Sequence, residues 1–211
     1  MNLDLGSPVL CSDGAERELA DLVVDAPAKR VTHLIVEPKG HREGARLVPL
    51  TLAREGADGI ALSCTAEALD GFDPVREYAY IRAGEHPAED DKWGVGVEDV
   101  LVTPTYAPLD PIEPELDPNV SVVYDRVPKG EVELRASSDV YSADQHHVGC
   151  VHGAEVESDG RLRSLTLLRG HLWWKRVISI PAAALASLET DLVTLGIEKG
   201  GLRGLPSRSA R

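Results

Sequence analysis

Two stretches of this chain, one near each end, carry the same order of turns, strand-forming residues and prolines. The spacing from Asp13 to Val31 equals the spacing from Asp144 to Leu162, and each interval joins a polar turn to an apolar run. Two later landmarks keep their spacing to within a single residue; they are Pro49 and Leu62 in the first copy, and Pro181 and Leu195 in the second. Self-similarity of this kind indicates a duplicated structural unit. The sequence therefore predicts two copies of one small domain.

Both copies favour β-structure. In the first, a turn at residues 25–29, where Pro27 presets the φ angle, precedes a run of branched side chains at 31–37. In the second, residues 154–157 and 162–168 flank Asp159-Gly160, which is a strong hairpin signal. Each copy then has a β-forming residue followed by proline, at 48–49 and 180–181, where a strand should end. We expect one or two helical turns at 182–188, and closing strands at 60–62 and 192–195.

The size of each copy also constrains the fold. A unit this small with several short strands is typical of a small β-barrel or sandwich. It buries only a thin core, so two copies gain stability by packing together or by dimerising. We therefore expect an all-β fold with short helical turns, and either a homo-oligomer or pairing of the two copies within one chain.

Several segments together resemble one known family. They are residues 9–14, 21–25, 30–37 and 48–50 in the first copy, and Asp144, 148–151, 170–173 and 177–181 in the second. The family is the PRC-barrel family, which is named for the cytoplasmic part of the photosynthetic reaction centre H subunit and also occurs at the end of a ribosome maturation factor. Residues 128–135 are similar to the lead-in of tandem PRC-barrel proteins of unassigned function in actinobacteria. The resemblance implies two six-stranded, partly open β-barrels that serve as an interaction or assembly module, with no shared active site. The second copy departs from the family pattern at Gln145, which replaces the usual glycine of the turn, and at Trp174, where a small residue is common.

The expected domains are a first PRC-barrel-like domain at 1–69, an acidic proline-rich linker at 70–133, a second PRC-barrel-like domain at 134–206 and a tail at 207–211. The linker contains 16 acidic and 5 basic residues, and therefore most of the chain's net charge of −13. It also holds 8 of the 14 prolines, a composition that resists compact folding. Residues 78–81, 93–102 and 120–124 are still able to form strands against a barrel. We expect a linker that is partly extended and partly docked.

The acidic composition of the chain also limits the kinds of partner that it can bind. Nucleic acid and anionic membrane surfaces attract clusters of Lys and Arg, and the sequence contains no such cluster. The N-terminus has no basic region followed by an apolar core, and no apolar run reaches the length of a bilayer. Cys11, Cys64 and Cys150 form no even framework, so we expect small buried or half-buried thiols. These features predict a cytoplasmic protein with a protein partner, no direct contact with nucleic acid or membrane, and no cofactor.

One group of residues has the chemistry of a metal site. His146, His147, Cys150 and His152 lie close together in the sequence, and imidazole and thiolate are ligands that zinc prefers. If residues 148–152 form a strand, Cys150 and His152 point to the same face, and a site would close only if one turn histidine folded back to join them. The spacing matches no established zinc motif. The alternative is an ordinary polar turn with one inward cysteine and one solvent-facing histidine, so the sequence assigns no metal.

A tryptophan pair marks the expected partner contact. Trp173 and Trp174 are adjacent, and adjacent residues on a strand face opposite sides. One ring is therefore expected near the surface, where tryptophan is a favoured interface residue, beside the basic pair Lys175 and Arg176. We predict a partner or dimer contact at this hairpin; the alternative is that both rings cap the edges of a barrel core.

Catalytic motifs are not found. The sequence has no Gly-x-Ser-x-Gly elbow, glycine-rich phosphate loop or His-Glu-x-x-His segment. Asp13 and Asp144 recur at equivalent turns, where capping by the side chain explains them more simply than catalysis. The sequence therefore predicts a non-enzymatic interaction or assembly module, an adaptor without catalytic residues. Two alternatives stay open: a metal-binding or metal-sensing protein that uses the His/Cys cluster, and an accessory factor of the ribosome-maturation type.

Overall fold

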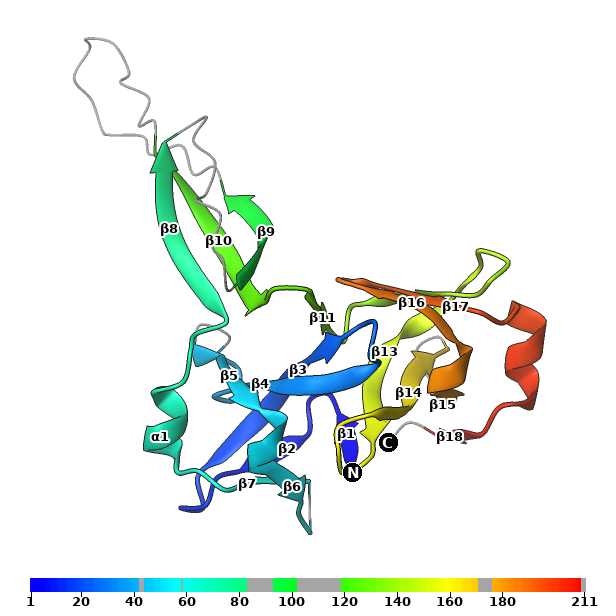
Figure 1. The fold of residues 1–211 in the computed structure, drawn as a ribbon, viewed down its shortest axis with the longest axis horizontal. Coiled ribbons are helices and arrows are strands. Elements are labelled where there is room, and N and C mark those ends of the chain that lie inside the picture. Colours follow the sequence, from blue (N-terminus) through cyan, green and yellow to red (C-terminus); the bar gives the residue numbers. More distant parts are fainter. Residues whose placement is uncertain (42–43, 58, 83–92, 102–118, 171–175, 210–211) are drawn as a thin grey trace. The chain divides into compact units, whose positions relative to one another are not determined.

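The computed structural model of the chain describes residues 1–41, 44–57, 59–82, 93–101, 119–170 and 176–209. Strands make up most of its secondary structure, so the all-β prediction is confirmed (Figure 1). The chain divides into two compact units, one of Met1–Asp73 with Gly130–Arg211 and one of Pro74–Lys129. None of the helices in the described part of the chain is long and apolar enough to cross a membrane.

The first copy of the repeat forms one sheet, with the strand order β5-β4-β3-β2-β7-β6. Its strands are β2 (Pro8–Leu10), β3 (Glu16–Asp25), β4 (Arg30–Glu37), β5 (Arg46–Pro49), β6 (Ala53–Glu55) and β7 (Ile60–Leu62). Neighbouring strands are antiparallel except β2 and β7, which are parallel. The short helix η2 (Leu50–Leu52) follows Pro49, and α1 (Ala66–Asp70) follows β7. The strands predicted at 31–37 and 60–62 are therefore confirmed.

The second copy forms a sheet with the order β16-β17-β12-β13-β14-β15-β18. Its strands are β12 (Asp139–Tyr141), β13 (His147–Val156), β14 (Leu162–Arg169), β15 (Arg176–Pro181), β16 (Leu185–Glu189), β17 (Leu192–Leu195) and β18 (Ser207–Ser209). The short helices η3 (Ala182–Ala184) and η4 (Lys199–Gly204) follow β15 and β17. Apart from β18, this order matches the first sheet strand for strand, and β12 and β17 again form the parallel pair. Within the described residues, no pairing joins the two ends of either sheet.

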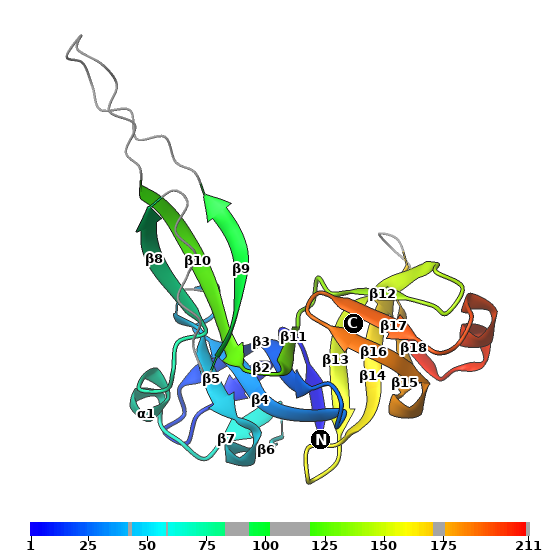
Figure 2. The same cartoon turned by 45° about the horizontal axis from the view of Figure 1, so that its top comes forward.

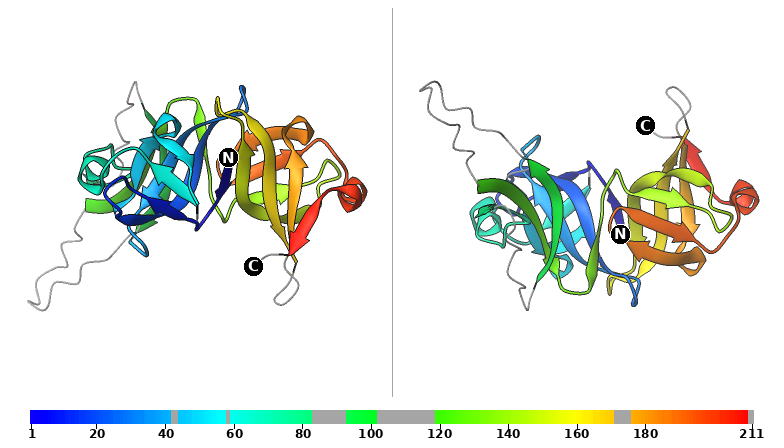
Figure 3. Two further views of the ribbon diagram at one scale, coloured as in Figure 1. Left: turned by 90° about the horizontal axis from the view of Figure 1, so that it is seen from below. Right: turned by 90° about the horizontal axis from the view of Figure 1, so that it is seen from above.

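Each sheet also receives one strand from the other copy. The N-terminal strand β1 (Asn2–Asp4) pairs antiparallel with β13 of the second sheet, with Leu3 opposite Ala154. In return β11 (Glu131–Leu134) pairs antiparallel with β3 of the first sheet, with Leu134 opposite Leu22 (Figure 2). Figure 3 shows the dark-blue N-terminal strand beside the yellow strands of the second sheet. The two copies are therefore joined by a reciprocal exchange of strands.

The β-hairpins of the two copies meet at their turns. The N–H of Val31 donates to the carbonyl oxygen of Gly160 at 2.9 Å, and the N–H of Leu162 donates to that of Lys29 at 2.9 Å. Lys29 and Gly160 occupy equivalent turn positions, and both have positive φ angles, of 49° and 84°. The Lys29 ammonium also donates to two carbonyl oxygens of the second copy, those of Ala182 at 2.9 Å and Leu185 at 2.7 Å. These contacts fix the copies against each other.

One hydrophobic cluster extends through both sheets. The exchanged residues Leu3 and Leu134 are fully buried in it, as are Leu22 of the first sheet and Leu165 of the second. Burial of apolar side chains is the main favourable contribution to folding. Since the exchanged strands supply part of each core, we expect the two copies to unfold together.

The acidic segment between the copies contains a small sheet. It consists of β8 (Arg76–Arg82), β9 (Trp93–Leu101) and β10 (Asn119–Pro128), with β10 in the centre and antiparallel to both neighbours. The stretches considered as strands at 78–81 and 120–124, and the described residues 93–101 of the third stretch, thus pair with one another. Residues 83–92 and 102–118 of the expected linker lie outside the described residues. The strand β11 spans the boundary expected between residues 133 and 134.

The prediction of helical turns at 182–188 is wrong beyond Ala184. Residues Leu185–Glu189 form β16, which pairs with β17, and the register shifts between Leu185 and Ser187. That bulge places Leu185 and Leu188 together in the core, although residues three apart on a regular strand face opposite sides. Apolar residues three apart are also typical of an amphipathic helix, and for this reason the sequence pattern wrongly predicted helix at these positions.

Candidate functional site

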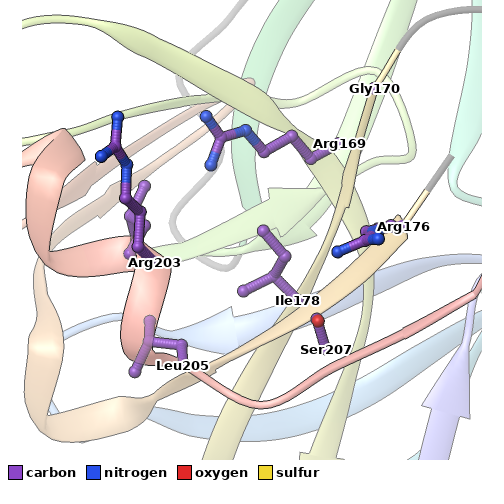
Figure 4. Close-up of a pocket in the computed structure, with 8 residues that line it drawn as sticks. Arg169, Gly170, Arg176, Ile178, Arg203, Leu205 and Ser207 are labelled. Carbon is purple, nitrogen blue, oxygen red and sulfur yellow. The ribbon is translucent and has the colours of Figure 1, made fainter. Parts of the chain in front are cut away.

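A pocket lined by three arginines lies at the end of the β14–β15 hairpin in the second sheet. It has a volume of about 350 Å³. The residues that line it are Arg169, Gly170, Arg176, Ile178, Leu202, Arg203, Leu205 and Ser207. They come from the end of β14 and the residue after it, from β15, from η4 and the residue after it, and from the start of β18. Figure 4 shows the side chains of Arg169 and Arg203 on the same side of the pocket, with Ile178, Leu205 and Ser207 below them.

The strand register sets two of the arginines directly opposite each other. Arg169 ends β14 and Arg176 begins β15, and the two are cross-strand partners. Like charges in such positions lower the stability of a sheet. Gly170, with a φ angle of 121°, turns the chain out of β14 at this point. The hairpin therefore ends in a local excess of positive charge, which an anion would neutralise.

No carboxylate neutralises these arginines within the described residues. The ion pairs recorded there include Arg161 with Asp159, Arg163 with Glu155 and Arg208 with Asp4, but none with Arg169, Arg176 or Arg203. Arg169 is half-buried, and Arg176 and Arg203 are exposed. Guanidinium groups bind carboxylate and phosphate oxygens through paired hydrogen bonds. The pocket is thus chemically suited to an oxyanion.

Apolar side chains form the rest of the lining. Ile178 and Leu202 are 7% and 3% exposed, and Leu205 is half-buried. A second hollow, of about 340 Å³, is lined by residues of both signs, including Arg54, Glu55 and Glu157. Binding pockets usually combine apolar walls with a few convergent polar groups. The arginine pocket meets that description better than the mixed hollow.

The predicted partner contact falls largely outside the described residues. Trp173, Trp174 and Lys175 belong to the segment 171–175, which the structure does not describe. Arg176 is described, and it lines the arginine pocket. The sequence analysis missed Arg169 and Arg203 as its companions, because the strand register sets Arg169 opposite Arg176 and only the fold brings the more distant Arg203 to them.

The predicted histidine and cysteine candidates separate into different environments. The side chains of His147 and Cys150 both lie close to the carboxylate of Asp139, a residue that the sequence analysis did not consider. His146 lies apart from them, with its Nδ1 atom 3.1 Å from the Oδ2 atom of Asp144. His152 lies further along β13, where its carbonyl oxygen accepts from the N–H of Leu5.

The three cysteines are free thiols. Cys11 is buried, and Cys64 and Cys150 are half-buried, so this prediction is confirmed. Burial raises the pKa of the Cys11 thiol. Burial also raises the pKa of the Cys150 thiol, and the neighbouring Asp139 carboxylate adds to the effect. Both thiols are therefore protonated near neutral pH in the absence of a bound cation.

The repeated aspartates cap turns, as predicted. Asp13 accepts from the N–H groups of Ala15 and of Ala66, the first residue of α1. Asp144 accepts in the same way from the N–H of Lys199, the first residue of η4. These hydrogen bonds, led by that from Ala66, lower the pKa of Asp13; those from the Ser142 hydroxyl and the Lys199 N–H lower the pKa of Asp144. In each copy the aspartate thus ties the first turn to the helix after the last strand of the repeat.

Comparison with known proteins identifies no family for this chain. No protein-family model matches the chain, and no curated protein is similar enough in sequence to count as a relative.

Proposed function

We propose that this protein is a non-enzymatic binding module of two PRC-barrel-type domains that holds a carboxylate-bearing segment of a partner protein in the arginine pocket. The observation that carries the proposal is the direct opposition of Arg169 and Arg176 across two paired strands. A pair that lowers stability is retained more readily when it serves binding. The module would act as a cytoplasmic adaptor.

The net charge favours a peptide over a polyanion. The chain carries a net charge of −13, so a nucleic acid or an anionic membrane would meet overall repulsion. A single glutamate or aspartate side chain needs only a local positive site. Ile178 and Leu205, next to the arginines, suit an apolar side chain of the same segment. The expected ligand is therefore an acidic segment that also contains leucine or a similar residue.

The size of the site sets the expected affinity. Two charge-assisted hydrogen bonds contribute about 3–6 kcal/mol, and burial of one large aliphatic side chain contributes about 1.5–3 kcal/mol. These two contributions sum to about 4.5–9 kcal/mol, which corresponds to dissociation constants between roughly millimolar and micromolar. Such affinities suit a reversible adaptor.

A matched pair of peptide sets tests the proposal. Fluorescently labelled peptides in which glutamate alternates with leucine are titrated with the tag-free full chain, alongside peptides in which glutamine replaces glutamate. We expect the glutamate peptides alone to bind, and higher salt to weaken the binding. Arg169→Gln should reduce the affinity at least tenfold. The control is Arg163→Gln on the same strand, since Arg163 is paired with Glu155 at 3.2 Å and lies outside the pocket.

Three outcomes would overturn the proposal. The first is equal binding of the glutamate and glutamine peptides. The second is binding of short single-stranded RNA that Arg169→Gln abolishes, which would make the ligand a nucleic acid. The third is self-association of the intact chain, measured by sedimentation, that Arg169→Gln abolishes, which would make the occupant a second copy.

A further inference from the structure

We propose a zinc site formed by Asp139, His147 and Cys150, on the second sheet and outside the arginine pocket. Asp139 begins β12, and the other two residues belong to β13. One ligand atom from each residue lies within 4.8 Å of the other two. The Nε2 atom of His147 lies 2.9 Å from the Oδ1 atom of Asp139, and the Sγ atom of Cys150 lies 3.7 Å from the same oxygen.

These separations are close to those around a tetrahedral zinc ion. Zinc binds imidazole nitrogen and carboxylate oxygen at about 2.0–2.2 Å and thiolate sulfur at about 2.3 Å. Tetrahedral angles then separate neighbouring ligand atoms by roughly 3.4–3.6 Å. The Asp139–Cys150 separation already matches, and the Oδ1 atom of Asp139 and the Nε2 atom of His147 would move apart by about 0.5 Å to admit the ion.

A β-bulge brings the two ligands of β13 to one face. His147 and Cys150 are three residues apart and would face opposite sides of a regular strand. The register between β12 and β13 shifts between Val140 and Tyr141, so that Cys150 pairs with Asp139 and His147 pairs with Tyr141. Bulges commonly redirect side chains next to functional sites.

The scaffold holds these ligands firmly. Asp139 lies between two strands, since β12 pairs with both β13 and β17, and its N–H donates to the carbonyl oxygen of Asp191 at 2.9 Å. The ring of Tyr141 packs edge-on against the ring of His147, with centroids 5.5 Å apart. Ligands fixed on paired strands are better preorganised than ligands on a loop.

The fold itself does not require these residues. At the corresponding positions of the first sheet, Pro8 pairs with Glu18, and Glu16 pairs with Leu10. The first copy therefore builds the same strand pair without histidine or cysteine. The three ligands are specific to the second copy, which separates them from the residues that the shared architecture needs.

The ligand set favours zinc over magnesium or calcium. Thiolate and imidazole are soft or borderline ligands, whereas magnesium and calcium take oxygen ligands. A carboxylate and a thiolate ligand together supply two negative charges, which match a divalent cation. The side chains of Asp139 and His147 are 50% and 49% exposed, so solvent reaches the ion and a water molecule would complete its coordination. We therefore assign an open, exchangeable site rather than a closed structural one.

Cobalt substitution tests the site directly, because Co²⁺ bound to a thiolate shows a charge-transfer absorption band. The tag-free full chain is stripped of metal under reducing conditions and titrated with Co²⁺ and then with Zn²⁺. We expect one equivalent of Co²⁺ to give the band and Zn²⁺ to displace it. Cys150→Ser should abolish the band, and His147→Asn should weaken Zn²⁺ binding about tenfold or more.

His146→Asn and Cys64→Ser are the matched controls, since neither residue belongs to the cluster. Both should bind like the unmodified chain, and thermal unfolding confirms that all variants fold. Absence of stoichiometric binding would overturn the proposal. So would binding that survives Cys150→Ser and His147→Asn but is lost in His146→Asn, because it would reflect surface histidines alone.

Discussion

Removing the buried side chain of an exchanged strand should destabilise the sheet of the other copy. Leu3 is fully buried, and it belongs to the N-terminal strand that pairs with β13. Replacing a buried leucine by alanine costs about 2–5 kcal/mol. For a protein of this size, each kcal/mol shifts the melting temperature by roughly 2–4 °C. We therefore expect Leu3→Ala, and equally Leu134→Ala in the reciprocal strand, to lower the melting temperature by about 4–20 °C.

Thermal unfolding followed by circular dichroism measures this effect. Leu10→Ala is the matched control, because Leu10 is 50% exposed and its truncation should change the stability by less than about 0.5 kcal/mol. If Leu3→Ala shifts the melting temperature no more than Leu10→Ala does, β1 does not complete the core of the second sheet. If Leu3→Ala and Leu134→Ala each shift a separate transition, the two copies fold independently and the shared core is refuted.

Three further substitutions test the contacts between the copies and the turn caps. Gly153→Ala should destabilise the protein by more than 2 kcal/mol in chemical denaturation, because a Cβ atom there would lie 2.2 Å from the carbonyl oxygen of Leu3; a change below about 0.5 kcal/mol would contradict the pairing. Lys29→Met keeps the aliphatic stem but loses two charge-assisted hydrogen bonds, so we expect a loss of about 3–6 kcal/mol in the same assay. Asp13 and Asp144 have lowered pKa values in the folded protein, so their stabilising effect is present above the ordinary carboxyl pKa and is lost as the pH falls through the folded values. In Asp144→Asn, the melting temperature should therefore fall less steeply as the pH is lowered into the acid range. An unchanged pH dependence would contradict the capping role of Asp144.

The sequence predicted most strands within each copy because local signals were present. Branched residues and an Asp159-Gly160 turn mark the hairpins, and residues 60–62 and 192–195 stand out as short apolar runs. The exchange of β1 and β11 gave no such signal. Leu3 is a single apolar residue in a three-residue strand, and its partner strand lies about 150 positions away in sequence. A local sequence pattern does not specify pairing between strands that lie so far apart in the sequence.

The candidate sites were predictable only in part, for the same reason. The histidine and cysteine cluster drew attention to His147 and Cys150, but Asp139 depends on the bulge between β12 and β13. The arginine pocket depends on the register that sets Arg169 against Arg176, and on η4, which brings Arg203 to them. Each site therefore joins residues that become neighbours only through strand pairing.

The most direct test of the arginine pocket is the variant Arg176→Glu, measured for both peptide binding and stability. An opposite charge facing Arg169 should raise stability by about 0.2–1 kcal/mol, or roughly 0.4–4 °C in melting temperature. Isothermal titration with the best glutamate–leucine peptide should at the same time show at least a tenfold loss of affinity. A variant that is more stable but does not bind is the result that the account predicts. Unchanged peptide affinity in Arg176→Glu would contradict it.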